Sequence, residues 1–97
     1  MENKGRVKVV VQVLVEFSRS GDMLPREILW LDENGEERRY LIDRVKDIRQ
    51  AAANRAGGLG DRYTIVVNGR ETYLFFDRSA NRAGTRLGTW FVERRSA

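Results

Sequence analysis

The sequence predicts a mainly β fold: a small six-stranded antiparallel barrel or strongly bent meander sheet, SH3-like or OB-like, with at most one short helix. Two observations indicate strands. Valine or phenylalanine occupies every odd position from 7 to 17, which is the period-two pattern of a β-strand. Asn-Gly pairs at 34–35 and 68–69 lie between strand-forming segments, as in tight hairpins. Closure into a barrel would remove the sheet edges that promote aggregation.

The chain order of the elements follows from these signals and from the turn residues between them. The polar segment 18–22 ends the first strand, and Pro25 stands where the next begins, a position that tolerates proline. With a length of 97 residues, we expect one domain spanning residues 1–97. The six predicted strands span residues 7–17, 28–31, 38–48, 62–67, 70–77 and 89–93.

Residues 43–56 allow two interpretations. Val45, Ile48 and Ala52 match the apolar stripe of a helix that Asp43 would cap. Alternatively, the third strand continues through Ile48, and an irregular loop rich in alanine and glycine follows, with at most one helical turn. We favour the strand followed by a loop.

The composition excludes several kinds of chemistry. The chain has no cysteine and no histidine, so disulfides, thiolate zinc sites and serine–histidine or cysteine–histidine catalysis are closed to it acting alone. No pair of carboxylates has a spacing that indicates cooperation in acid–base catalysis. We therefore predict a protein that is not an enzyme and has no catalytic residue, cofactor or metal site.

The charge is unevenly distributed. Residues 1–43 carry 7 basic and 9 acidic residues, a balance of −2, whereas residues 44–97 carry 11 and 5, a balance of +6. A polyanion would therefore meet the second half first. The apolar run 9–15 is far shorter than the roughly 20 residues of a membrane helix. We expect a cytoplasmic protein that does not enter a membrane.

A plain meander would separate short turns from long loops. The two Asn-Gly turns would fall at one end, and the loops near residues 18–24, 49–61 and 78–88 at the other. The word ANRAG occurs in two of these loops, at 53–57 and 80–84. Each copy is either a simple turn or part of an anion-binding cradle of backbone amides and arginines. The candidate residues of the cradle are Arg55 and Arg82, widened by Arg19, Arg62, Arg78 and Arg86.

The fifth strand carries two candidate aromatic contacts. A two-residue turn at 68–69 places Tyr63 opposite Leu74 on the core face. On the other face it places Tyr73 and Phe75 near Arg62. Aromatic residues beside an arginine on an outward sheet face are used for base stacking. Alternatively, the two rings pack under the N-terminal strand or a loop.

The order of several short segments resembles a family of short bacterial β-rich proteins without an assigned activity. The resemblance covers about residues 25 to 93 and implies a small β-rich domain, but no site residues. The segments that carry it are Pro25, Ile28 and Trp30, Tyr40 with 42–45, 62–64, 73–75 and 90–93.

These observations favour a non-enzymatic module that binds or scaffolds another macromolecule. The alternative is a nucleic-acid-binding module in which arginine-rich loops contact phosphates while Tyr73 and Phe75 stack on bases. A third hypothesis is homodimerisation through Val10 and Leu14 on the even face of the first strand. We expect a monomer or a weak homodimer.

Overall fold

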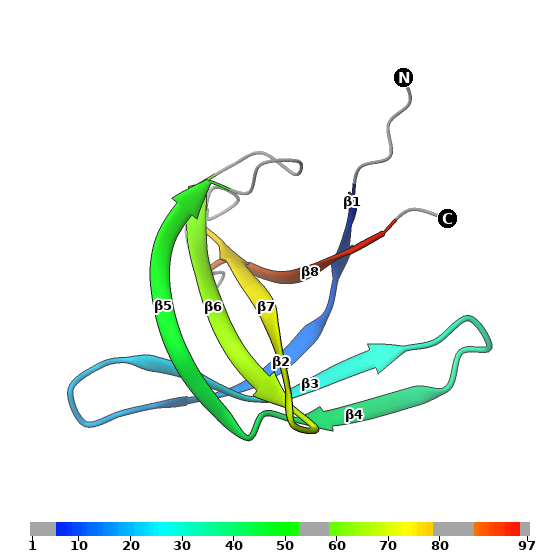
Figure 1. The fold of residues 1–97 in the computed structure, drawn as a ribbon, viewed down its shortest axis with the longest axis horizontal. Coiled ribbons are helices and arrows are strands. Elements are labelled where there is room, and N and C mark those ends of the chain that lie inside the picture. Colours follow the sequence, from blue (N-terminus) through cyan, green and yellow to red (C-terminus); the bar gives the residue numbers. More distant parts are fainter. Residues whose placement is uncertain (1–5, 53–58, 79–86, 96–97) are drawn as a thin grey trace.

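The computed structural model describes residues 6–52, 59–78 and 87–95, whose regular elements are all β-strands. They form two antiparallel sheets (Figure 1). The large sheet has the strand order β1-β8-β7-β6-β5, and the small sheet has the order β2-β3-β4. The predicted mainly β, antiparallel fold is confirmed. The strands are β1 (Arg6–Val10), β2 (Gln12–Phe17), β3 (Met23–Leu31), β4 (Glu37–Leu41), β5 (Arg44–Ala52), β6 (Leu59–Val67), β7 (Arg70–Asp77) and β8 (Thr89–Arg95).

The described chain forms eight strands rather than the six predicted, because two predicted strands are divided between the sheets. The first is divided at Val11, whose N–H donates to the Trp90 carbonyl at 3.1 Å. The third is divided at Ile42 and Asp43. Sharp bends of this kind let one segment serve two sheets. Within the described ranges the strands lie in two sheets, and no closed barrel forms.

The helical interpretation of residues 43–56 is wrong for Arg44–Ala52, which forms β5. β5 pairs with β6 along its length, with Ile48 opposite Tyr63 and Ala51 opposite Gly60. The predicted end at Ile48 is therefore too early, because strand pairing continues through the small residues that follow. Tertiary pairing overrides the local helical stripe. The predicted helical turn at 53–56 lies outside the described residues.

Both Asn-Gly pairs lie in hairpin turns, but of the two asparagines only Asn68 has a positive φ. Asn68 and Gly69 have φ angles of 53° and 77°, as a two-residue hairpin turn requires, and Gly35 has a φ of 80°. The two turns do not share one end of the molecule, however: the β3–β4 turn is the tip of the small sheet (Figure 1). The β6–β7 turn lies near the bend at residues 42–43, where Asp43 donates to the Val66 carbonyl. Consecutive strands pair antiparallel within each sheet, but the prediction of one meander through all strands is wrong, because that bend redirects the chain into a second sheet.

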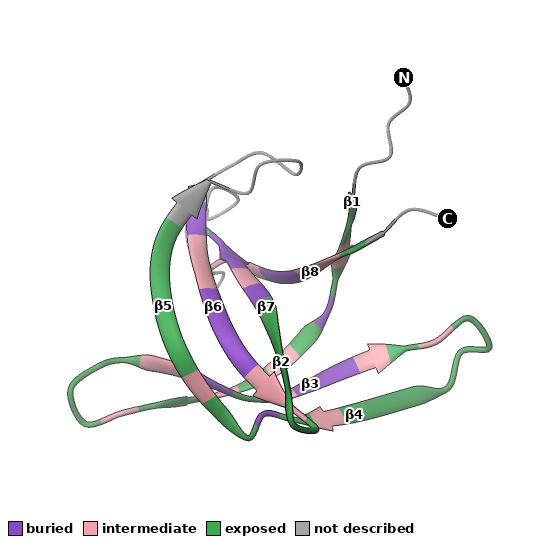
Figure 2. Ribbon diagram, viewed as in Figure 1, coloured by how far each residue is buried: buried purple, intermediate pink, exposed green. Residues whose placement is uncertain are grey.

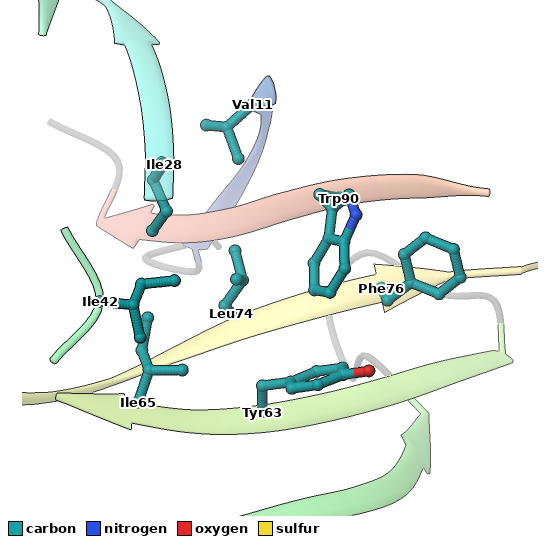
Figure 3. Close-up of a cluster of buried hydrophobic side chains, with 8 residues drawn as sticks. All are labelled: Val11, Ile28, Ile42, Tyr63, Ile65, Leu74, Phe76 and Trp90. Atoms are coloured by element: carbon teal, nitrogen blue, oxygen red, sulfur yellow. The ribbon is translucent and has the colours of Figure 1, made fainter. Parts of the chain in front are cut away.

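The core lies between the two sheets. Ile65 and Leu74 are 0% exposed, and the Trp90 ring lies 5.1 Å from Tyr63 and 4.8 Å from Phe76, measured between centroids. The predicted core face of β6 and β7 is therefore confirmed. Buried residues concentrate on β3, β6, β7 and β8, whereas β4 and β5 are mostly exposed (Figure 2). The buried cluster comprises Val11, Ile28, Ile42, Tyr63, Ile65, Leu74, Phe76 and Trp90 (Figure 3).

Candidate functional site

The outward face of the large sheet carries the aromatic residues that the sequence indicated. Arg62 lies opposite Phe75 and Thr64 opposite Tyr73, which is the predicted register. Phe75 in turn lies opposite Phe91 on β8. Arginine and aromatic side chains therefore follow one another across β6, β7 and β8.

Ring stacking occupies most of this aromatic surface. The Phe75 and Phe91 rings are parallel within 10°, with centroids 5.0 Å apart, and Phe91 is only 1% exposed. Lys8 Nζ lies 4.6 Å from the centroid of Phe91 and donates to Asp77 Oδ2 at 3.3 Å. Such stacked and cation–π contacts stabilise the side-chain arrangement. Of the two predicted contacts, Phe75 is half-buried, and Tyr73 presents more of its surface to solvent, at 46% exposed.

Arg62 is held against the protein. Its guanidinium carbon lies 4.5 Å from the centroid of the Tyr73 ring. Its Nε atom is buried and has no described hydrogen-bond partner, and the same is true of Glu93 Oε2. The cation–π contact, on the order of 0.5–1 kcal/mol at such sites, therefore positions Arg62 over one face of the Tyr73 ring.

The other candidate arginines are distributed over several elements. Arg78 Nη1 donates to Asp61 Oδ2 at 2.9 Å, and Arg19 is exposed in the β2–β3 turn. The start of β6 and the end of β7, which adjoin the two ANRAG segments in the chain, are neighbours, since Gly60 lies opposite Asp77. Both copies of ANRAG, with Arg55, Arg82 and Arg86, lie outside the described residues.

Tyr63 links three elements near this end of the large sheet. Its hydroxyl donates to the Met23 carbonyl at 3.1 Å. Burial raises the pKa of Tyr63, Asp61 raises it further, Arg78 opposes the shift, and Asp22 adds a smaller increase. The start of β3, the start of β6 and the residue after β7 therefore approach one hydroxyl. Because two of these three charged groups are carboxylates, the described part of this end is not uniformly positive.

The charge asymmetry of the sequence corresponds to the division into sheets. Residues 12–41, the small sheet with its turns, contain 4 basic and 7 acidic residues, a balance of −3 that lies in the turns, because the three strands themselves contain 3 basic and 3 acidic residues. The five strands of the large sheet contain 9 basic and 5 acidic residues, a balance of +4. A polyanion would therefore approach the large sheet, whereas the turns of the small sheet would repel it.

An apolar surface covers part of the outward side of the small sheet and the adjoining end of β1. Val10, Leu14, Leu31 and Leu41 are 62%, 44%, 69% and 67% exposed. Leu14 and Leu41 both lie opposite Glu27 on β3, which places them on one face. We call these four residues the leucine face. The sequence indicated Val10 and Leu14; Leu31 and Leu41 join them only once strand register is known.

Two adjoining cavities lie where β1 separates from β3. One, of about 280 Å³, is lined among others by Val9, Val10, Trp30, Leu31 and Glu37. The other, of about 370 Å³, shares three of these residues. Together they form one groove, which we call the β1–β3 groove. Its size is near the lower limit of small-ligand sites. The second cavity is lined by Val9, Trp30, Leu31, Asp32, Glu33 and Arg94.

The acidic end of this groove is an ordered turn. Asp32 Oδ1 accepts the N–H groups of Asn34 and Glu36 at 2.8 and 2.9 Å, and Oδ2 accepts from Arg38 Nε at 3.1 Å. The bond from the Glu36 N–H is the main cause that lowers the pKa of Asp32; desolvation opposes it, and the bonds from Arg38 and Asn34 add to the lowering. The Asp32 carboxylate therefore serves the turn, which leaves Glu33 as the exposed charge beside it.

Comparisons with known proteins bring no relative: no family model, curated protein or solved structure matches this chain. The resemblance over residues 25–93 therefore stays a prediction. Residues 6–52, 59–78 and 87–95 contain no helix long and apolar enough to cross a bilayer. The same ranges hold no group of three or more His, Cys, Asp or Glu side chains suited to a metal ion.

Proposed function

We propose that this chain is a non-enzymatic module that binds another protein through the leucine face. The observation that carries the proposal is the exposure of Leu14, Leu31 and Leu41 on the outward face of the small sheet, with Val10 exposed at the adjoining end of β1. Contiguous exposed apolar patches on soluble proteins mark interaction sites. The strands of the small sheet carry no net charge and its turns carry −3, which favours a protein partner over a nucleic acid at this surface.

The SH3-like or OB-like relationship belongs to this proposal. Two segments of the chain, 6–17 and 37–52, each contribute to both sheets. This sharing supports an opened form of a small-barrel architecture, in which exposed strand faces and edges serve as binding surfaces.

Substitution of the leucine face tests the proposal. Burying one leucine contributes about 1.5–3 kcal/mol, so Leu14→Ser with Leu41→Ser should weaken partner binding at least tenfold. Leu87, which is 55% exposed and outside both sheets, provides the matched control Leu87→Ser. Tagged wild type and control should retain the same identified protein from a lysate at 0.5 M salt, where a Debye length of about 4 Å screens most attraction between charges. The double variant should lose that protein. Equal retention by all three, or none by wild type, would contradict the proposal.

A second candidate function is nucleic-acid binding by the large sheet. The observation in its favour is the +4 balance of the large-sheet strands together with Arg62 stacked on the half-exposed Tyr73. If phosphates bind here, affinity for an oligonucleotide should fall steeply and log-linearly with salt, and Tyr73→Leu should weaken binding to single strands. The absence of binding to single- or double-stranded DNA and RNA at low salt would end this candidate.

A further inference from the structure

The edges of two strands face each other across the β1–β3 groove. β2 pairs with β3 only as far as Gln12 and Leu29. Beyond that pair the strands separate: β1 turns to pair with β8, and β3 continues beside β4 (Figure 1). β1 is the last strand of the large sheet, so its second edge has no strand partner among the described residues.

Backbone polar groups point into this gap from both sides. In an antiparallel pair, the N–H and C=O of one residue point to the same side, and consecutive residues alternate. Val11 donates to Trp90 on β8, so Lys8 and Val10 direct their backbone groups toward the free edge of β1. Asp32 donates to Glu36 across the β3–β4 hairpin, so Leu31 directs its own groups away from β4. The gap therefore offers strand-type donors and acceptors on both walls.

The groove occupies the position of a missing strand. Val9 and Trp30 pack against the core, whereas Val10 and Leu31 are exposed on the outward side. All four residues line the same cavity of about 280 Å³. Because the cavity is lined by inward and outward residues of both strands, it extends from the edge of β1 to the edge of β3. A further strand would lie in this plane.

We propose that the β1–β3 groove binds an extended peptide segment with alternating apolar and basic side chains, by addition of the peptide as a strand along β1. Backbone hydrogen bonds to Lys8 and Val10 give affinity, as in other cases of β-augmentation. The apolar side chains of the peptide contact Val9 and Trp30. This inference rests on the proposed protein-binding function and specifies the partner's chemistry.

The net charge of the groove determines which charge the bound peptide should carry. Asp32, Glu33 and Glu37 line the two cavities, against one basic residue, Arg94. Glu33 is exposed, and the ion pair between Glu37 and Arg39 is long, at 3.8 Å. Lysine or arginine side chains of the peptide would neutralise this excess, whereas acidic peptides and nucleic acids would be repelled.

The probe for the test is an acetylated and amidated hexapeptide of alternating lysine and valine, added to ¹⁵N-labelled protein. The amide signals of Lys8, Val10 and Leu31 should shift, and hydrogen exchange at Val10 and Leu31 should slow at least tenfold. The same hexapeptide with N-methyl groups on alternate residues, and a glutamate–valine hexapeptide, should bind at least tenfold more weakly. Absence of these shifts with millimolar lysine–valine peptide, or equal binding of the N-methylated form, overturns the proposal.

Two variants separate this inference from the proposed function. Val10→Pro removes one donor from the free edge and leaves the β8 pairing of Val9 and Val11 in place, so a folded variant should lose peptide binding. The Leu14→Ser, Leu41→Ser variant should keep peptide binding while losing partner capture. Suppose that this variant loses partner capture and that the wild type binds no peptide. The proposed function would then stand, and strand addition would be overturned. Shifts at Lys8 and Val10 that follow protein concentration alone would identify a second copy as the occupant and likewise overturn it.

Discussion

Ile42 and Asp43 are adjacent in the chain, and their backbone N–H groups donate to opposite sheets. Ile42 donates to the Arg26 carbonyl on β3 at 2.9 Å, and Asp43 donates to the Val66 carbonyl on β6 at 2.8 Å. One peptide step thus transfers the chain from the small sheet to the large one without leaving either backbone donor unpaired. The Ile42 side chain, 6% exposed, belongs to the core at the same point.

Truncation of this buried side chain should destabilise the protein strongly. For Ile42→Ala we expect a loss of about 2–4 kcal/mol in the free energy of unfolding, from lost burial and the cavity left behind. The matched control is Ile48→Ala, because Ile48 is 44% exposed on β5, and it should lose less than about 1.5 kcal/mol. Urea unfolding followed by circular dichroism measures both. Equal losses would show that the bend does not depend on core packing.

Gly60→Ala should destabilise the large sheet. A Cβ at Gly60 would overlap the Phe76 carbonyl oxygen and come within 3.0 Å of its carbon, and backbone atoms cannot rotate away. We expect a loss of about 1–3 kcal/mol from overpacking. Gly35→Ala is the comparison, because its surroundings are open and only its φ of 80° opposes a side chain. A thermal scan should place Gly60→Ala at or below Gly35→Ala in Tm, and a wild-type Tm for Gly60→Ala would contradict the overlap.

Tyr63 should make stability fall at high pH. Because burial raises the pKa of Tyr63 above its usual value near 10, the folded protein holds this proton more tightly than the unfolded chain does. Its contribution to stability is complete below pH 10 and is lost as the pH rises through the raised value. Tyr63 should therefore ionise late in an absorbance titration at 295 nm. That late phase should vanish in Tyr63→Phe and persist in Tyr73→Phe. Its survival in Tyr63→Phe would assign it elsewhere.

Phe91→Ala should be among the costly changes on the outward face of the large sheet. Phe91 is 1% exposed, stacks on Phe75 and contacts the Lys8 ammonium. We expect a loss of about 3–5 kcal/mol, as for buried aromatic residues in general. Tyr73→Ala on the same face should cost clearly less, since Tyr73 is 46% exposed. Chemical unfolding of the two variants under one buffer condition gives the comparison. Similar midpoints would mean that the stack adds little.

The parts of the fold that depend on neighbouring residues could be predicted from the sequence. The turn at 68–69 sets the register of β6 and β7, because a two-residue loop leaves one pairing of the flanking strands. That register in turn separates Tyr63 and Leu74 in the core from Tyr73 on the outward face. Alternating valines likewise predicted an extended segment over 7–17, which the structure contains as β1 and β2.

The bends and the surfaces that depend on them could not be predicted in the same way. Alternation continues through Val11 and shows no local break, because the change of sheet is determined by partners far along the chain, such as Trp90. Leu31 and Leu41 join one exposed face only through pairing across β3 and β4. The predicted anion cradle at Arg55 and Arg82 stays a prediction, since both residues lie outside the described ranges.

The balance of −3 over residues 12–41, which lies in the turns of the small sheet, and the balance of +4 over the large-sheet strands give the molecule a permanent electric dipole directed from one end to the other. Near a charged solid the protein will therefore orient rather than attach at random. A carboxylated sensor chip will hold it by the strands of the large sheet and leave Leu31 and Leu41 facing the solution. An amine-bearing chip will reverse that orientation and mask them, so the choice of immobilisation chemistry determines which surface an analyte can reach.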